Sequence, residues 1–277
     1  MKRQFGLVTV LALIATFIFG SAGTVGATGS TVVVTPTNTQ GWSTADTRPG
    51  GAVMFVDGDA PPGGGTGSLQ LTTAATNVAK AQYIHAANIP LAAVTELGYS
   101  TKRISGPDIA DASFQVVVCL LGAPTPATSE HPFICPGYTT LVFEPYENGM
   151  VGSGWQKWNV AKGQLWSSKS VTDGTCTVMA GFGGPPFYTL GDITSMCRNA
   201  IMVGFGVNLG SYNPSWQVLT DLVDFNGTTY DFEKYSVPTN KDQCKDGGYK
   251  TFNPPSGPYK NQGQCVSSTN HQGDGND

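Results

Sequence analysis

Short segments rich in β-branched and aromatic residues recur along this chain, and turn-forming residues separate each one from the next. The turn signals come roughly every 8–15 residues, and the segments between them lack a helical period. Such spacing is typical of an all-β fold in which antiparallel strands form a β-sandwich or jelly roll. The clearest predicted strands are residues 31–36, 52–58, 67–73, 112–121, 138–146, 176–181, 200–210 and 216–225.

The composition agrees with this fold class and limits the partners. The chain has 36 glycines and 18 prolines, too many for a helical protein, and only 12% of its residues are charged, against about 25% in an average protein. A net charge of −4 gives no basic surface for nucleic acid or anionic membrane, so we expect neither as a partner. We predict one β-sandwich domain over residues 28–235, acting as a monomer.

The strongest local prediction is a β-hairpin at LVDFNGTTYDF, residues 222–232. Asn226-Gly227 between two alternating segments favours a two-residue type I′ turn, which would place Val223 opposite Tyr230. The same Asn-Gly-Thr matches a glycosylation sequon, but the turn explains it without a sugar. The core side would carry Val223, Phe225, Tyr230 and Phe232, and the solvent-facing or ligand-binding side would carry Asp224, Asp231 and Glu233. By contrast, residues 74–95 favour a short helix or an irregular crossover, broken at Pro90.

The first 27 residues have the layout of a secretory signal peptide. A basic start at Lys2 and Arg3 is followed by an apolar run to Gly20 and by small residues ending at Ala27, after which we predict cleavage; Ala22 is the second choice. The alternative, an uncleaved anchor, is disfavoured because the run is shorter than the about 20 residues that a spanning helix needs. No later segment is long enough, so we predict a secreted protein, extracellular or associated with the cell surface.

An exported chain meets an oxidising environment, in which its six cysteines are expected to form disulfides. Six cysteines allow 15 connectivities. Proximity in sequence favours Cys119–Cys135, Cys176–Cys197 and Cys244–Cys265. The last pair would close a small loop in a polar C-terminal segment, residues 236–277, which we predict to be a linker and a disulfide-closed tail, disordered beyond Val266.

Two groups of motifs resemble known secreted proteins. The first is DTRPGGAVMFVDG, PPGGGTGSLQL, LGYSTKR, TTLVFEPY, WQKWNV, QLWSS and VDFNGTTYDFE, in that order over residues 31–235. They resemble a family of secreted bacterial proteins of the actinobacterial type, which implies a jelly-roll sandwich of the concanavalin-like or carbohydrate-binding-like kind. The second, CKDGGYKTF followed by KNQGQCV (residues 244–266), is similar to a cysteine-bounded tail of secreted actinobacterial proteins and implies no activity.

Three of the five tryptophans lie in GWQKWNVAKGQLW, residues 154–166. If residues 161–163 form a turn, QLWSS would pair back on WQKWNV as a hairpin. Trp155 and Trp158 have opposite parity and would face opposite sides of a strand, one toward the core and one toward solvent. A buried tryptophan is the ordinary use of such a residue in a sandwich, whereas an exposed ring beside polar side chains suits sugar binding. The candidate ligand-binding residues are Trp155, Gln156, Trp158, Asn159 and Trp166.

Other candidate sites rest on carboxylates. Glycoside hydrolysis uses two carboxyl groups about 5–10 Å apart, for which Asp231 with Glu233, or Glu144, are the candidates. Asp57 and Asp59 on a tight turn could contribute oxygens to a structural Ca²⁺ ion, with Asp224 or Asp231 approaching from another strand. The sequence contains no G-x-S-x-G motif, so it gives no sign of a serine hydrolase.

These observations favour a secreted, non-catalytic binding or surface-associated protein whose ligand is a polysaccharide or a cell-wall glycan. Two alternatives stay open. One is a glycan-active hydrolase that uses the carboxylates above, and the other is a purely structural envelope protein.

Overall fold

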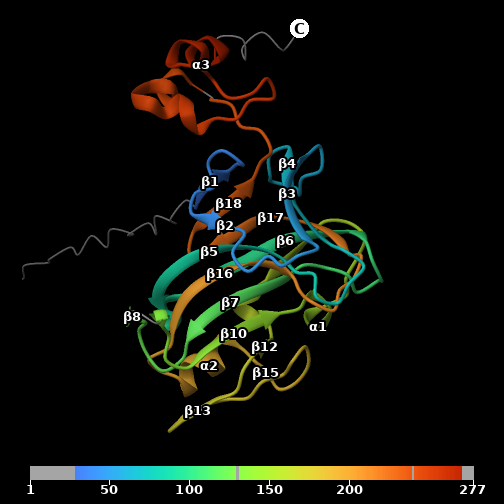
Figure 1. Ribbon diagram of the computed structural model, residues 1–277, viewed down its shortest axis with the longest axis vertical. Helices are drawn as coiled ribbons and strands as arrows, with labels where there is room; N and C mark the ends of the chain where they lie inside the picture. The colour runs from blue at the N-terminus through green and yellow to red at the C-terminus, as the bar shows by residue number, and fades with distance from the viewer. Residues whose placement is uncertain (1–28, 129–130, 239, 270–277) are drawn as a thin grey trace, which may run out of the picture.

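The computed structural model describes residues 29–128, 131–238 and 240–269, and it contains two stacked seven-stranded sheets (Figure 1). The predicted β-sandwich is therefore confirmed. The predicted signal peptide, residues 1–27, lies outside the described residues. Within the described ranges, no helix has the length and apolar character needed to cross a membrane.

The first sheet, sheet 1, is organised around the central strand β17 (Gln217–Phe225). One edge of β17 pairs along its whole length with β6 (Leu97–Ser105), and β6 in turn pairs with β11 (Gln156–Asn159). Leu222, in the middle of β17, has a left-handed φ of 48°, and the register with β6 shifts between Asp221 and Asp224. A bulge of this kind bends a strand and changes its pairing.

The other edge of β17 divides between two partners, and we call this place the fork. The first half of β17 pairs with β4 (Gly67–Thr73), which continues to β3 (Gly51–Asp57). The second half pairs with β18 (Thr228–Phe232), which continues to β1 (Ser30–Val34). The β1–β18 pair is parallel, whereas the other pairs of this sheet are antiparallel. The prediction of a wholly antiparallel sandwich thus needs this one correction.

The second sheet, sheet 2, is antiparallel throughout the described strands. Residues in its strands alternate between the core and the outer face, as the pleat of a β-sheet requires. In spatial order, its strands are β15 (Phe187–Tyr188), β12 (Leu165–Ser167), β10 (Tyr138–Phe143), β7 (Ser113–Cys119), β16 (Ile201–Leu209), β5 (Ala81–Pro90) and β2 (Trp42–Ser43).

Short elements connect these strands. Two small hairpins lie outside the main sheets, and α2 begins with a capping box between Thr189 and Asp192. The short elements are η1 (Leu91–Ala93), β8 (Thr125–Thr128), β9 (His131–Ile134), α1 (Pro145–Asn148), η2 (Val160–Lys162), β13 (Val171–Asp173), β14 (Cys176–Val178) and α2 (Leu190–Met196).

The core lies between the two sheets and is rich in aromatic rings. Trp42 of β2 packs on Tyr83 of sheet 2 and on Phe232 of sheet 1, with ring centroids 5.4 and 5.0 Å apart. Such contacts add to the burial that holds stacked sheets together. The largest fully buried side chains are Leu69, Leu71, Leu91, Leu97, Tyr99, Phe114, Leu120, Leu141, Phe143, Leu165, Phe205 and Phe232.

Two local predictions about connections are wrong. Residues 81–90, within the segment predicted as a helix or crossover, form β5, because Ala81 and Tyr83 alternate into the core while the strand pairs with β16 and β2. The predicted hairpin of WQKWNV with QLWSS does not form either. The single turn η2 carries the chain from β11 in sheet 1 to β12 in sheet 2, so the two segments pair with different strands.

The hairpin at Asn226-Gly227 has the predicted register, with Val223 opposite Tyr230. Its four apolar side chains belong to the core or pack against it. The Asn226 side chain accepts hydrogen bonds from the backbone N–H groups of Thr95 and Glu96 and donates to the Ala93 carbonyl. The turn asparagine is therefore used to fasten a neighbouring loop.

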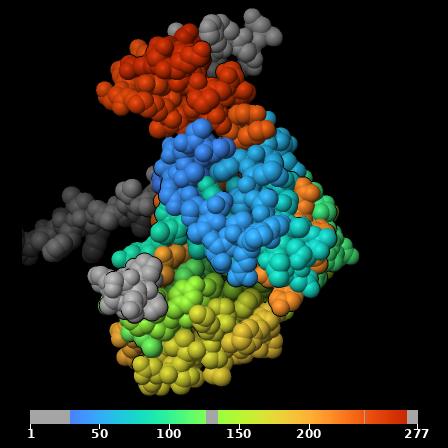
Figure 2. Space-filling model, in the orientation of Figure 1, coloured from blue at the N-terminus to red at the C-terminus, as the bar shows by residue number. Residues whose placement is uncertain are grey.

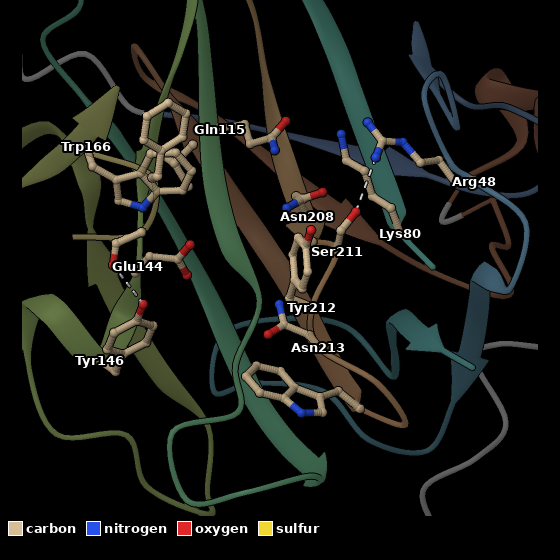
Figure 3. A pocket seen from close by; sticks show the side chains of 15 residues that line it. Arg48, Lys80, Gln115, Glu144, Tyr146, Trp166, Asn208, Ser211, Tyr212 and Asn213 are labelled. Carbon is tan, nitrogen blue, oxygen red and sulfur yellow. Dashed lines mark hydrogen bonds between the residues drawn. The ribbon is translucent and has the colours of Figure 1, made fainter. Parts of the chain in front are cut away.

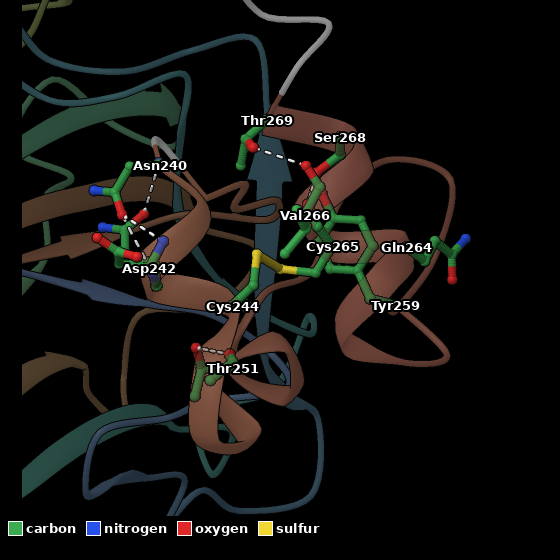
Figure 4. Close-up of a disulfide and its surroundings, with 12 residues drawn as sticks. Asn240, Asp242, Cys244, Thr251, Tyr259, Gln264, Cys265, Val266, Ser268 and Thr269 are labelled. Carbon is green, nitrogen blue, oxygen red and sulfur yellow. Dashed lines mark hydrogen bonds between the residues drawn. A yellow bond between two sulfur atoms is a disulfide. The ribbon is translucent and has the colours of Figure 1, made fainter.

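The structure contains three disulfides, Cys119–Cys135, Cys176–Cys197 and Cys244–Cys265, which are the pairs that proximity in sequence predicts. The last one lies in the C-terminal tail, which forms a separate lobe beside the sandwich (Figure 2). There it joins η3 (Lys241–Thr251) to α3 (Gln262–Thr269), and Tyr259 packs on it to make a small second core (Figure 4). Residues 267–269 are thus helical, contrary to the predicted disorder beyond Val266; residues 270–277 lie outside the described ranges.

Candidate functional site

A groove of about 550 Å³ crosses the outer face of sheet 2 (Figure 3). Its floor follows from strand alternation: Phe114 and Val116 point into the core, so Gln115 between them points outward. The residues that line the groove are Arg48, Lys80, Gln115, Val142, Glu144, Tyr146, Trp166, Phe182, Gly183, Asn208, Gly210, Ser211, Tyr212, Asn213 and Trp216. They come from several strands or their ends, from α1 and from loops that are distant in the sequence, so no single segment of sequence encodes the groove.

Two loops bring exposed aromatic rings to the groove. Phe182, between β14 and β15, is 81% exposed, and Tyr212, between β16 and β17, is 79% exposed. Both have left-handed backbone conformations, with φ of 49° and 70°. Bulky residues in this region cost on the order of 1 kcal/mol each, and such strain gathers at functional sites. Both aromatic residues are thus exposed to solvent, and both adopt a backbone conformation that favours glycine.

Two buried polar atoms in the groove lack a hydrogen bond of normal geometry. Within the described residues, the Trp166 Nε1 and Asn208 Oδ1 atoms are buried and have no hydrogen bond of normal geometry. The Asn208 side chain is held in place because its Nδ2 donates to Ser113 Oγ at 3.1 Å. Most buried polar atoms in folded proteins have a partner, so each exception calls for one from outside the chain, such as a water molecule or a ligand.

Glu144 lies at one end of the groove, beside Trp166 and Tyr146 (Figure 3). Protein atoms surround its carboxyl group, while the groove still leaves part of the side chain accessible to solvent. Burial raises the pKa of Glu144 to about 8; hydrogen bonding from the Trp166 indole opposes this rise, and the negative charges of Glu147 and Asp111 add to it. Around neutral pH this carboxyl group is therefore mostly protonated.

The opposite end of the groove is cationic (Figure 3). Arg48 donates a hydrogen bond to Ser211 Oγ at 3.2 Å, and its Nε lies 3.6 Å from Asp46 Oδ1. Lys80 is largely buried and forms an ion pair with the same Asp46 carboxylate. Two cations thus share one anion, which leaves this end with a net positive charge.

The structure separates the five predicted ligand-binding residues. Trp166 lines the groove on sheet 2. Trp158 belongs to the core, and its Nε1 donates to Thr101 Oγ1 at 2.7 Å. Trp158 and Asn159 also line a smaller cavity of about 340 Å³ on sheet 1, where the Asn159 side chain caps η2.

The other two predicted residues serve local structure. The half-buried Trp155 donates from Nε1 to Asp59 Oδ1 at 2.8 Å. The Gln156 side chain closes its own loop by accepting from the Gly152 N–H and donating to the Met150 carbonyl. Because the chain passes from sheet 1 to sheet 2 at η2, residues before and after this turn lie at different places on the molecule, and Trp166 alone of the five lines the groove.

The predicted metal ligands have other partners. Asp57 is exposed at the end of β3. Asp59 uses Oδ2 for an ion pair with Lys102 Nζ at 2.6 Å and Oδ1 for Trp155. Across the part of the chain that the structure describes, no group of three or more His, Cys, Asp or Glu residues could hold a metal ion.

The acidic side of the Asn226-Gly227 hairpin is buried, contrary to the prediction that it faces solvent or a ligand. The reason is the loop of residues 58–66, which covers it: Glu233 accepts from the Thr66 and Gly67 N–H groups at 2.8–3.1 Å. Asp224 pairs with Lys157 at 2.8 Å. Asp231 and Glu233 line neither the groove nor the smaller cavity.

Comparisons with known proteins add little to this description. No protein-family model and no curated protein matches the chain. It is similar to a family 11 carbohydrate-binding module from Clostridium thermocellum, solved with a β-1,3-1,4-mixed-linked tetrasaccharide: the TM-score is 0.34, the identity 10%, and the match covers 70% of this chain and 91% of that one.

Two further structures score similarly. A family 11 carbohydrate-binding module of a cellulosomal cellulase of Clostridium thermocellum has a TM-score of 0.32 and 9% identity, with 67% of this chain and 94% of that one covered. A structure of carbohydrate-binding modules of the β-sandwich superfamily with promiscuous specificity has a TM-score of 0.31 and 11% identity, covering 67% and 56%. At these scores, the fold assignment rests on the sheets themselves.

Sequence reasoning named Trp166 and Glu144 but missed the rest of the groove. The sequence does mark the two aromatic loops, because each places a large ring among turn-forming residues: Phe182 in GFGGPPF and Tyr212 in GSYNPSW. An aromatic side chain in a turn cannot reach the core easily, so it indicates a surface role. Nothing in the sequence indicates that these loops meet at one groove.

Proposed function

We propose that this protein binds a glycan in the groove on sheet 2. The observation that carries the proposal is the combination, in one groove, of solvent-exposed aromatic rings with polar atoms that lack partners. A sugar ring offers an apolar C–H face to an aromatic side chain and hydroxyl groups to polar ones. Concave sites that pair rings with a few placed polar groups are typical of ligand binding.

The groove supports binding better than hydrolysis by paired carboxylates. Among its described lining residues, Glu144 is the only acid, whereas most glycosidases use two carboxyl groups across the scissile bond. The two other carboxylates considered, Asp231 and Glu233, are buried at the fork, where Glu233 accepts from the Thr66 and Gly67 N–H groups. We therefore place the protein among non-catalytic binding proteins.

The proposed site of action is outside the cell. The three disulfides support it, because such bonds persist in oxidising compartments. The N-terminal sequence, with its basic start and short apolar run, supports export. A polysaccharide or cell-wall glycan is the ligand that this location and the groove together favour.

Affinity electrophoresis through gels containing soluble polysaccharides tests the proposal. Trp166→Ala should weaken retention at least tenfold, about 1.4 kcal/mol, because buried aromatic anchors dominate binding energies. The matched control is Trp155→Ala, which removes a half-buried ring outside the groove and should leave retention unchanged. Equal losses in both variants, or no retention of the wild type on any polysaccharide, would contradict the proposal.

A further inference from the structure

Glu144 has a position that the general proposal does not explain. Its carboxyl group points into the groove beside the Trp166 indole (Figure 3), and no ion pair involves it within the described residues. The nearby Tyr146 hydroxyl donates elsewhere, to the Gly183 carbonyl at 3.4 Å. The Trp166 indole interacts with this carboxyl group, but its Nε1–H has no hydrogen bond of normal geometry within the described residues, so the two groups face the same part of the groove.

We propose that Glu144 is the specificity-determining hydrogen-bond donor of the groove: in its protonated form it donates, together with Trp166 Nε1–H, to an acceptor oxygen of the bound glycan. This inference rests on the proposed function and deepens it. The acceptor can be an uncharged sugar oxygen or the carboxylate oxygen of a uronic acid. Both present the same lone pairs to two convergent donors.

Burial, together with the negative charges around it, keeps Glu144 protonated. Glu147 of α1 and Asp111, which precedes β7, are acids, and Tyr146 and Tyr99 are phenols that remain uncharged near neutral pH. The two cations of the groove, Arg48 and Lys80, lie at its other end (Figure 3). Burial raises the pKa of Glu144 to about 8, so the donor form dominates below this pH.

Ionisation would reverse the role of this group. A carboxylate can only accept hydrogen bonds, so above about pH 8 it would face the acceptor oxygen of the ligand without a proton between them. Affinity then falls with the protonated fraction of Glu144, because only that form is competent. An isosteric glutamine keeps an N–H donor at every pH.

The experiment measures the Kd by isothermal titration at pH 6, 7, 8 and 9, with a neutral soluble β-glucan in one arm and a soluble polyuronate in the other. Wild-type affinity should fall about tenfold between pH 7 and 9. Glu144→Gln should bind at pH 6 within about threefold of the wild type and should lose the pH dependence. The control Glu147→Gln, an exposed neighbour on α1, should keep the wild-type profile.

The two polysaccharides and the variants distinguish failure of the role of Glu144 from failure of glycan binding. Circular dichroism at each pH checks that the proteins stay folded. Wild-type binding that does not change with pH, or a Glu144→Gln variant that keeps the wild-type slope or loses binding at pH 6, overturns the role of Glu144 but leaves glycan binding intact. Absence of wild-type binding to either polymer at pH 6 overturns both this role and its ligand classes. The arm with the steeper profile identifies the acceptor.

Discussion

The groove and the fork both contain buried carboxyl groups, but they use them in opposite ways. At the fork, Asp221 is fully buried, and its Oδ1 accepts from the backbone N–H groups of Leu222 and Phe232, both at 2.7 Å. Leu222 lies at the bulge of β17 and Phe232 ends β18, so both N–H groups lie where β17 exchanges β4 for β18. At the groove, the Glu144 carboxyl group has the Trp166 indole as its neighbour, and both side chains line the groove and are partly exposed to solvent.

The pKa values of the two groups do not reveal this difference. Burial raises the pKa of Asp221 to about 8, with the charges of Asp231 and Glu233 adding to it, and the same value applies to Glu144. What differs is the closure of the site. The loop of residues 58–66 seals the fork, and a Cβ atom on Gly64 would lie 3.1 Å from Asp221 Oδ2. A raised pKa does not distinguish the two places, and neither does an unpartnered atom, because Asp221 Oδ2 at the fork also has no hydrogen-bond partner within the described residues. The groove differs because its polar groups are open to a ligand.

The largest expected effect concerns how the free energy of unfolding depends on pH. Asp221 has a folded-state pKa above its unfolded value of 3.8, so its contribution is fully present below about pH 4 and is lost as the pH rises through about 8. At about 1.4 kcal/mol per unit of pKa shift, the loss has an upper bound on the order of 5 kcal/mol. Urea unfolding at pH 4, 6 and 8 should show this decline, and Asp221→Asn should make it shallower, with the remaining slope coming from groups such as Glu144 whose pKa is also raised.

A second effect separates the hydrogen bonds of Asp221 from its charge. Asp221→Ala removes the acceptor of two buried N–H groups and should lower the free energy of unfolding by about 3 kcal/mol at pH 6. Asp221→Asn keeps an oxygen acceptor and should lose much less. The folded fraction of either variant should bind glycan as the wild type does; weakened binding by folded protein would break the proposed separation of fork and groove.

The smallest effect concerns strain at the groove. Tyr212→Gly removes a ring that is 79% exposed and relieves a left-handed φ, so stability should stay unchanged or rise by up to about 1 kcal/mol. Binding should nevertheless weaken about threefold to tenfold. Ser215→Gly is the matched control, because Ser215 also has a positive φ of 62° but does not line the groove. Equal retention by Tyr212→Gly and Ser215→Gly would show that the Tyr212 ring does not contact the ligand.

Local patterns predicted those parts of the molecule whose partners lie nearby in sequence. The register at Asn226-Gly227 follows from a two-residue turn, and each disulfide joins cysteines 16 or 21 residues apart. Predictions failed where the partner was distant. Residues 81–90 became a strand because β16 and β2 flank them, and the acidic face of the hairpin is buried because the loop of residues 58–66 covers it.

The sequence by itself determined the fold class, the disulfide pairs and the residues with aromatic or acidic character, because alternation, turn chemistry and cysteine spacing act over short distances. Only the tertiary structure decided which of these residues share a site. Trp155 and Trp166 are eleven positions apart, yet Trp155 directly precedes β11 of sheet 1 and Trp166 belongs to β12 of sheet 2, whereas Glu144, Trp166 and Tyr212 line one groove. The reason is that sheet pairing, which joins distant segments, places the side chains of neighbouring strands on a common face.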